Sequence, residues 1–246
     1  MKAEADTSAD MAAADAAPQG SAAPEDETVE SLGEDGGRTV AKRRGGVLEG
    51  EALIYDEAGR LTVRATYGSG KLDGPMQCYD GDGELIQKSM YRAGVLDGQT
   101  VIYEAGQIQM VMNYVGGKRE GEAVVYHEGS VSSRLQYRKD RMEGESTWYS
   151  PEGAVVKAAT YVGGRQEGPT TTFYPDGQVQ EESMYRKGAL EGEVLRYHRN
   201  GELQRKASYR AGKLEGDPQE FDESGNPAGE DEESGGGWFS RLLGRS

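Results

Sequence analysis

The sequence has 246 residues, of which only 35% are hydrophobic and 37 are glycines, and its formal net charge is −15. Tyr, with 14 copies, is the one abundant large side chain, whereas Phe and Trp together number five. This composition excludes a thick apolar core and favours a thin layer whose aromatic rings cover one face. The acidic balance argues against nucleic acid or an anionic membrane surface as a partner, because both select clustered Lys and Arg.

Residues 1–45 are rich in Ala, Asp, Glu, Gly, Ser and Pro and contain no Tyr, Phe or Trp. Such a segment buries too little apolar surface to offset its ordering entropy, so a disordered acidic tail is predicted. Its one basic cluster, Lys42-Arg43-Arg44, is interpreted as a solvated linker. The N-terminus lacks a signal-like apolar run, and no segment approaches the ~20 apolar residues that span a bilayer. With the single cysteine Cys78, these features predict a reducing, cytoplasmic location.

From Gly46 onward the sequence repeats with a period of 23 or 24 residues. A glycine preceded by Glu or Asp marks each repeat: Gly50, Gly74, Gly98, Gly121, Gly144, Gly168, Gly192 and Gly216. An aromatic residue follows five positions later, at Tyr55, Tyr79, Tyr103, Tyr126, Tyr149, Phe173, Tyr197 and Phe221. A second column of tyrosines comprises Tyr67, Tyr91, Tyr114, Tyr137, Tyr161, Tyr185 and Tyr209. Thirteen of the 14 tyrosines therefore occupy two columns.

Two short runs in each repeat alternate between apolar and polar residues and are separated by glycine-containing turns, which is typical of β-hairpins. In the first repeat, one face of the second run would carry Leu61, Val63, Ala65 and Tyr67. We therefore predict an all-β fold, an elongated single-layer antiparallel meander of repeated hairpins over residues 46–225. Fifteen strands spaced ~4.8 Å apart would make a sheet roughly 70 Å long. We also expect the tyrosines to cover one face of this sheet.

The array is predicted to hold seven full repeats and a half repeat. The half repeat, Gly216–Gly225, is expected to cap the C-terminal edge. Pro218 and Pro227 in this region lack the N–H that a neighbouring strand would need, and thus discourage edge-to-edge association.

The repeat unit resembles a known family. Tyr91-Arg-Ala-Gly94-Val-Leu-Asp97-Gly98 through Tyr103, and the equivalent stretch from Tyr185 to Tyr197, look like the MORN variant repeat. This variant occurs in bacterial proteins of the YwqK-type toxin–antitoxin antitoxin family. The resemblance implies an elongated hairpin array that binds proteins, and it implies no catalytic residue.

Candidate catalytic and metal-binding residues are few. His127 and His198 are three repeats apart, or ~29 Å in a regular array, which excludes a shared zinc site. Both are interpreted as solvated hairpin residues. Cys78 takes the place of Ile, Val or Trp in other repeats and is interpreted as a packed hydrophobic residue. The acid before each glycine would accept turn hydrogen bonds, or alternatively hold calcium or a basic partner. We predict no catalytic residue, no metal and no cofactor.

Residues 226–246 are predicted to be a flexible acidic tail that ends in an aromatic and apolar motif. Its large apolar residues are spaced to share one face of a short helix: Trp238, Phe239, Leu242 and Leu243. We expect this segment to dock on a partner or on the array itself, with a membrane interface as the alternative.

The sequence thus predicts a non-enzymatic, cytoplasmic scaffold that binds a protein partner, for example a toxin, on its curved sheet. The candidate binding residues are those of the tail motif together with Tyr91, Tyr114, Tyr137 and Tyr161. The tyrosines would either form a platform for peptide or sugar or be the core of a one-layer sheet. The alternative function is a structural or peripheral membrane-associated organiser anchored by the C-terminal tail. The sequence leaves the oligomeric state open.

Overall fold

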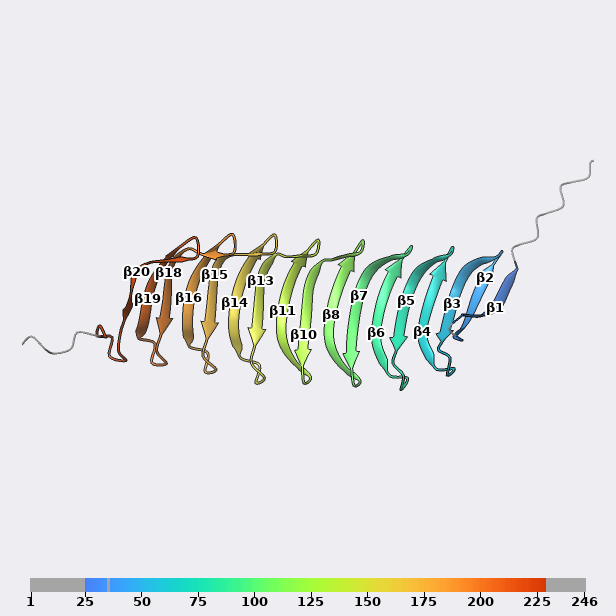
Figure 1. Ribbon diagram of the computed structural model, residues 1–246, viewed down its shortest axis with the longest axis horizontal. Coiled ribbons are helices and arrows are strands. Elements are labelled where there is room, and N and C mark those ends of the chain that lie inside the picture. Colours follow the sequence, from blue (N-terminus) through green and yellow to red (C-terminus); the bar gives the residue numbers. More distant parts are fainter. Residues whose placement is uncertain (1–24, 35, 229–246) are drawn as a thin grey trace, which may run out of the picture.

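Twenty antiparallel strands lie in one open layer (Figure 1). The computed structural model describes residues 25–34 and 36–228. Within these residues there is no helix, and hence none that is long and apolar enough to cross a membrane. The strands are β1 (Asp26–Leu32), β2 (Arg38–Arg44), β3 (Val47–Tyr55), β4 (Leu61–Gly68), β5 (Lys71–Tyr79), β6 (Leu85–Arg92), β7 (Val95–Glu104), β8 (Gln107–Val115), β9 (Lys118–Arg119), β10 (Gly121–His127), β11 (Ser130–Arg138), β12 (Arg141–Met142), β13 (Gly144–Tyr149), β14 (Val155–Val162), β15 (Arg165–Phe173), β16 (Val179–Arg186), β17 (Ala189–Leu190), β18 (Gly192–Tyr197), β19 (Leu203–Arg210) and β20 (Lys213–Glu220).

Each pass of the chain pairs with the pass that follows it, so the sheet is a meander of hairpins. The two-residue strands β9, β12 and β17 lie on the same pass as β10, β13 and β18, separated from them by the acid of the acid–glycine pair. Counted in this way, β3 to β20 make fifteen passes across the sheet. The predicted fold class and the fifteen strands of the repeat array are therefore confirmed.

The N-terminal boundary of the sheet was predicted wrongly. Residues 26–32 and 38–44, expected to belong to a disordered tail, form the paired strands β1 and β2, and β2 continues the sheet onto β3. An acidic strand faces a basic one, with Arg44 paired to Asp26 at 2.6 Å and Arg38 to Glu30 at 3.1 Å. Opposite charges across neighbouring strands stabilise such a pair without aromatic residues. Residues 1–24 lie outside the described residues.

The C-terminal end of the sheet closes as the half repeat predicts. Pro218 lies in β20, and Phe221 forms an antiparallel bridge with Pro227. The amide of Ala228 then donates to the carbonyl of Glu220 at 2.8 Å. The chain therefore folds back beside the last strand, over residues that the sequence assigned partly to the array and partly to the tail.

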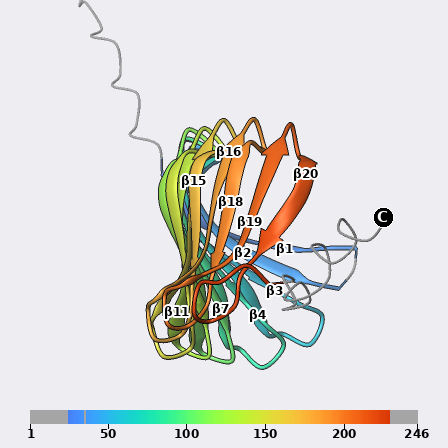
Figure 2. The same cartoon turned by 90° about the vertical axis from the view of Figure 1, so that its left-hand side faces the viewer.

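The sheet twists along its length. In the end view the strand direction turns progressively from β20 to β1, as right-handed strand twist requires in a long open sheet (Figure 2). Turns line both long edges of the layer, and β1 and β20 lie at opposite ends of it (Figure 1).

A column of small and medium-sized side chains runs along the middle of one face and holds the most buried residues of the sheet. Ser146 and Ser89 are fully buried and Ala159 is 1% exposed. The column passes from strand to strand at matching register positions: Ala41, Ala52, Ala65, Met76, Ser89, Thr100, Met112, Ala123, Leu135, Ser146, Ala159, Thr170, Ser183, Val194 and Ala207. Larger side chains on both sides shield it. The Trp148 and Tyr161 rings, for example, lie 6.4 Å apart beside the Ser146–Ala159 pair.

The two aromatic columns lie on opposite faces, which corrects the prediction that the tyrosines cover one face. Tyr67 pairs with Gly50 and shares the face of the buried column, which we call the tyrosine face. Tyr55 is five residues from Gly50, an odd number, so its side chain emerges on the other side. Accordingly, the Tyr197 hydroxyl donates at 2.8 Å to Glu182, which alternates with buried Ser183 and thus lies on the opposite face.

Candidate binding faces

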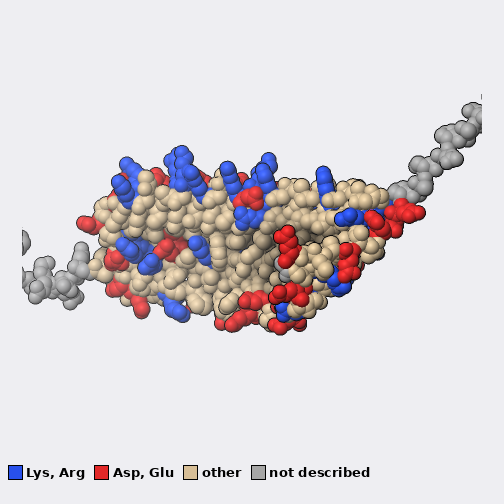
Figure 3. All heavy atoms as spheres, turned by 45° about the vertical axis from the view of Figure 1, so that its right-hand side comes forward, with Lys and Arg blue, Asp and Glu red and all other residues tan. Residues whose placement is uncertain are grey.

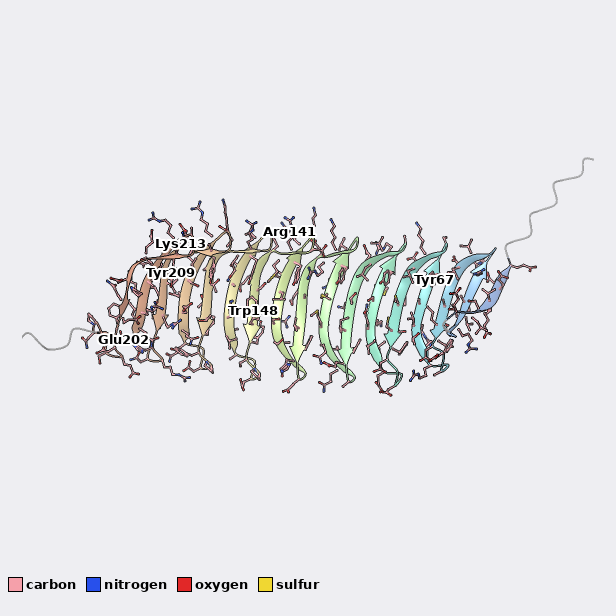
Figure 4. All side chains as sticks on the ribbon, in the orientation of Figure 1. Tyr67, Arg141, Trp148, Glu202, Tyr209 and Lys213 are labelled. Carbon is pink, nitrogen blue, oxygen red and sulfur yellow. The ribbon has the colours of Figure 1, made fainter. Side chains whose placement is uncertain are left out.

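The tyrosine face has a row of rings near one edge. Tyr67, Tyr91, Tyr114 and their equivalents occupy every second pass, and all are half-buried. Each ring lies between the glycine of one neighbouring strand and a larger residue of the other; Tyr67, for example, pairs with Gly50 and Leu72. Figure 4 shows Tyr67 and Tyr209 close to this edge, with Trp148 further across the sheet. Glycine leaves room for the ring, which explains why the two residue types recur together.

A second row, on the far side of the small column, is mainly apolar in the N-terminal part of the array. It runs through paired residues from β3 to β13: Ile54, Val63, Cys78, Gln87, Ile102, Met110, Val125, Ser133 and Trp148. From β14 onward the same row becomes mainly charged: Lys157, Thr172, Glu181, Arg196, Arg205 and Glu220. The Arg119 guanidinium, at the edge of the part from β3 to β13, lies over the Tyr137 ring, with Cζ 4.4 Å from the ring centroid. The tyrosine face is therefore mainly apolar from β3 to β13.

The opposite face carries cross-strand ion pairs, beside an apolar stretch of Val101, Val111 and Val124. Arg134 pairs with Glu122 at 2.6 Å, and Lys206 pairs with Glu193. This face also has a hollow of about 460 Å³ beside Arg134 and Tyr149. The hollow lies where the turn at residues 127–130 neighbours the turn at residues 150–154, which is one residue longer. The shorter turn accounts for the 23-residue spacing of this repeat.

The acid of each acid–glycine pair connects one repeat to the next. Six of the eight accept a hydrogen bond of 2.7–3.0 Å from a turn amide about twenty residues ahead: Glu49 from Ser69, Asp97 from Gly116, Glu120 from Lys139, Glu143 from Gly163, Glu167 from Lys187 and Glu191 from Ala211. The donor residues all have positive φ, so their amides point back along the array. The predicted turn role of these acids is confirmed, and it joins successive repeats rather than closing a local turn.

This connection predicts a measurable stability loss. Replacing Glu167 by Ala removes the acceptor for the Lys187 amide at 2.7 Å. We expect the free energy of unfolding to fall by about 1.5–3 kcal/mol, the typical worth of a hydrogen bond to a charged group. Glu145→Ala, at an exposed position, is the control and should change stability by less than about 0.5 kcal/mol. Urea denaturation followed by circular dichroism measures both; equal losses would contradict the assignment.

The other long edge of the sheet is built by self-capped turns. The Asp56 carboxylate accepts hydrogen bonds from the amides of Ala58 at 3.0 Å and Arg60 at 2.8 Å. The Arg60 amide is the largest cause that holds the pKa of Asp56 below its usual range. Asp222 repeats the arrangement, with its pKa lowered mainly by the Asn226 amide. These aspartates are therefore scaffold residues that stay ionised.

The remaining candidates for chemistry lie apart from one another. Cys78 is half-buried between Val63 and Gln87, and burial raises the pKa of its thiol, as fits a packed residue. His127 is exposed at the end of β10. His198, expected to be solvated, is instead half-buried and lies with Nε2 2.9 Å from the Phe221 carbonyl oxygen. Within the part of the chain that the structure describes, no group of three or more metal-ligating side chains occurs.

The predicted site residues separate into two groups. Tyr91, Tyr114, Tyr137 and Tyr161 lie in one row on β6, β8, β11 and β14. The tail residues Trp238, Phe239, Leu242 and Leu243 lie outside the described residues. The sequence analysis placed Val63 on the face of Ala65 and Tyr67 by alternation, but it did not name the apolar second row as a candidate binding surface.

Sequence reasoning also missed a row of basic side chains along the edge beside the second tyrosine column. We call it the basic edge; it comprises the turns 68–71, 92–95, 115–118, 138–141, 162–165, 186–189 and 210–213. Figures 3 and 4 show its Lys and Arg side chains protruding, with Arg141 and Lys213 labelled in Figure 4. Because these residues are about a repeat apart in sequence, a search for runs of Lys and Arg does not find them.

Comparison with known proteins supports the repeat type. The family model described as MORN repeat variant matches residues 166–187 and 190–211. No curated protein matches the sequence. Among solved structures, a porin-like protein from Bacteroides uniformis ATCC 8492 aligns with 13% identity over 80% of this chain and 95% of its own, with a TM-score of 0.19. None of these findings supports the closer resemblance to YwqK-type antitoxins, and the similarity to the MORN repeat variant extends over the two matched stretches of the array.

Proposed function

We propose that the protein is a non-enzymatic, cytoplasmic scaffold that binds a protein partner on the tyrosine face between β3 and β13. MORN repeats suggest a repeat scaffold or binding protein in general. The particular face, the location and the class of partner are our proposal. A toxin neutralised by this contact, or a protein held by an adaptor, would each fit the same surface.

The observation that carries the proposal is the uncovered apolar surface of this face. From β3 to β13 it combines a tyrosine row, a small-residue column and an apolar row. No described element packs over it, because the sheet is a single layer (Figure 1). Extended apolar surface of this kind marks interaction sites in soluble proteins.

The residue types also suit a protein interface. Tyr rings offer a large apolar area with a polar hydroxyl and lose little conformational entropy on binding, and aromatic residues are enriched at interface centres. The ion pairs Arg64–Glu51 and Arg134–Glu122 lie on the opposite face, where desolvation would be costly. The distribution of the ion pairs therefore favours the tyrosine face as the binding side.

A pair of matched methionine variants tests the proposal. Met110 lies on the tyrosine face, where it is half-buried and pairs with Ile102 and Val125 of the apolar row. Met90, 37% exposed, lies on the opposite face beside buried Ser89. A partner is first isolated by affinity capture with the intact chain and then titrated, as a purified protein, against Met110→Asp and Met90→Asp.

We expect Met110→Asp to weaken binding by at least about 30-fold, because a hot-spot loss costs about 2 kcal/mol or more. Met90→Asp should bind within about 2-fold of the unmodified chain, because a charge outside the contact costs little. Equal losses in both variants, or a loss confined to Met90→Asp, would contradict the assignment of this face. Circular dichroism of both variants checks that the sheet is intact.

A further inference from the structure

The two long edges of the sheet carry opposite charges. The turns of the basic edge contain eleven Lys and Arg residues and one acid, Asp140. The other edge, which we call the acidic edge, comprises the turns 56–60, 80–84, 104–107, 127–130, 150–154, 174–178, 198–202 and 222–226. These contain twelve acids and two bases, Arg60 and Arg199. The sheet is thus positively charged along one long edge and negatively charged along the other, although the chain as a whole is acidic.

Most of the charges on the basic edge are unpaired within the described residues. Eight of its eleven bases form no ion pair there, and all eight are exposed: Lys71, Lys118, Lys139, Arg141, Arg165, Arg186, Lys187 and Lys213. Acids close to this edge are occupied, because they accept the backbone amides that join the repeats. Exposed cations without partners remain available to an anionic surface.

The acidic edge also has few ion pairs. Within the described residues its one ion pair joins Arg60 to Asp56. Asp82, Glu104 and Glu128 lie in three consecutive turns and are exposed. Each edge therefore presents free charge of one sign.

Both edges have the same spacing. A turn recurs on each edge once per repeat, which is once per two strands, so the charges on each recur every ~9.6 Å. Any surface that matches the basic edge must present carboxylates at this interval along a protruding line. The acidic edge of a second copy presents carboxylates at this interval, because the same strand spacing sets the distance between successive turns on both edges.

We propose that the protein associates with itself side by side, the basic edge of one copy docking on the acidic edge of the next. The contact joins two different surfaces, so each copy keeps one free edge and the assembly grows as an open row. Because the sheet twists, the contact extends over a few neighbouring repeats rather than the full edge (Figure 2). Both faces of the sheet stay accessible, so this association is independent of the proposed binding function.

The net charge of −15 opposes association at long range but does not control this contact. At ~0.1 M salt the Debye length is about 10 Å, so charges beyond the contacting edges are largely screened. Within the contact, Lys and Arg meet carboxylates at close range. The association is therefore expected at moderate ionic strength. It should disappear at ~0.5 M salt, where the attraction between the charges of the two contacting edges is itself screened.

Sedimentation velocity of the full chain over a range of concentrations tests the proposal. At ~0.1 M salt we expect the sedimentation coefficient to rise with concentration, and at ~0.5 M salt to stay at the monomer value. Two triple variants remove one edge each. Lys118→Glu, Arg141→Glu and Arg165→Glu reverse one charge in each of three consecutive turns of the basic edge. Asp82→Lys, Glu104→Lys and Glu128→Lys reverse one charge in each of three consecutive turns of the acidic edge.

Each triple variant alone should associate less than the unmodified chain at every concentration, because like charges then meet in the three altered repeats. Mixing the two variants should restore association, because a reversed edge of one complements the reversed edge of the other. This rescue distinguishes a specific contact from a general effect of net charge. Monomers at every concentration, association that survives ~0.5 M salt, or a mixture that stays monomeric would each overturn the proposal.

Discussion

Replacing Gly98 by Ala is expected to lower the free energy of unfolding by roughly 3 kcal/mol. Gly98 has φ +122°, a conformation that L side chains rarely adopt, and an added Cβ would lie 2.8 Å from Cβ of Met90. Backbone strain of this kind costs about 1–3 kcal/mol, and relief of the clash requires β6 and β7 to separate. Because stability in a repeat array is nearly nearest-neighbour, the loss should be concentrated in the adjacent strands.

Gly121 occupies the same position of the next repeat and supplies a matched control. It has φ +79°, close to the left-handed region, and no atom lies within 4 Å of the place that an added Cβ would take. Gly121→Ala should therefore cost about 1 kcal/mol, the ordinary penalty for an L residue in this region. Hydrogen exchange of the amides in β6 to β8 and β10 measures both changes, and equal protection losses would contradict the steric account of Gly98.

Replacing Ala159 by Leu is expected to destabilise the centre of the array by about 2–3 kcal/mol. Ala159 is 1% exposed and pairs directly with fully buried Ser146 and with Thr170. The rings of Trp148 and Tyr161 lie beside this pair, so a larger side chain must displace them. The ring contact and the close packing of the paired small residues would be lost together.

Ala158 is the control for this change, because it is the neighbouring residue on the opposite face and is half-buried. Ala158→Leu should alter the free energy of unfolding by less than about 0.5 kcal/mol. Urea denaturation monitored by circular dichroism gives the stability of both variants. A larger loss for Ala158→Leu would show that the small column is not the packed centre of the sheet.

The repeat spacing predicted most of the fold because turn chemistry and alternation act locally. Glycine at positive φ and an acid beside it recur at fixed positions, and these alone set the hairpin edges. The pair β1 and β2 escaped prediction because it lacks glycine spacing and aromatic residues. Its cohesion comes from opposite charges such as Asp26 and Arg44, a signal that emerges only when the two strands are placed side by side.

The binding surface could be predicted in part. The tyrosines Tyr91 to Tyr161 were found from their spacing, but the assignment of both aromatic columns to one face was wrong. An odd separation, from Gly50 to Tyr55, places the first column on the other side of the sheet. The two charged edges were not found, because each collects residues that are a full repeat apart in sequence and adjacent only in the folded sheet.

Hydroxyl-radical footprinting of the complex with the captured partner tests the central claim most directly. Tyr side chains react with the radical, and the two columns report the two faces separately. The account predicts that Tyr91, Tyr114 and Tyr137 become protected on binding, whereas Tyr79 and Tyr103 keep the reactivity of the free protein. Protection of Tyr79 and Tyr103, with the second column unchanged, would contradict it.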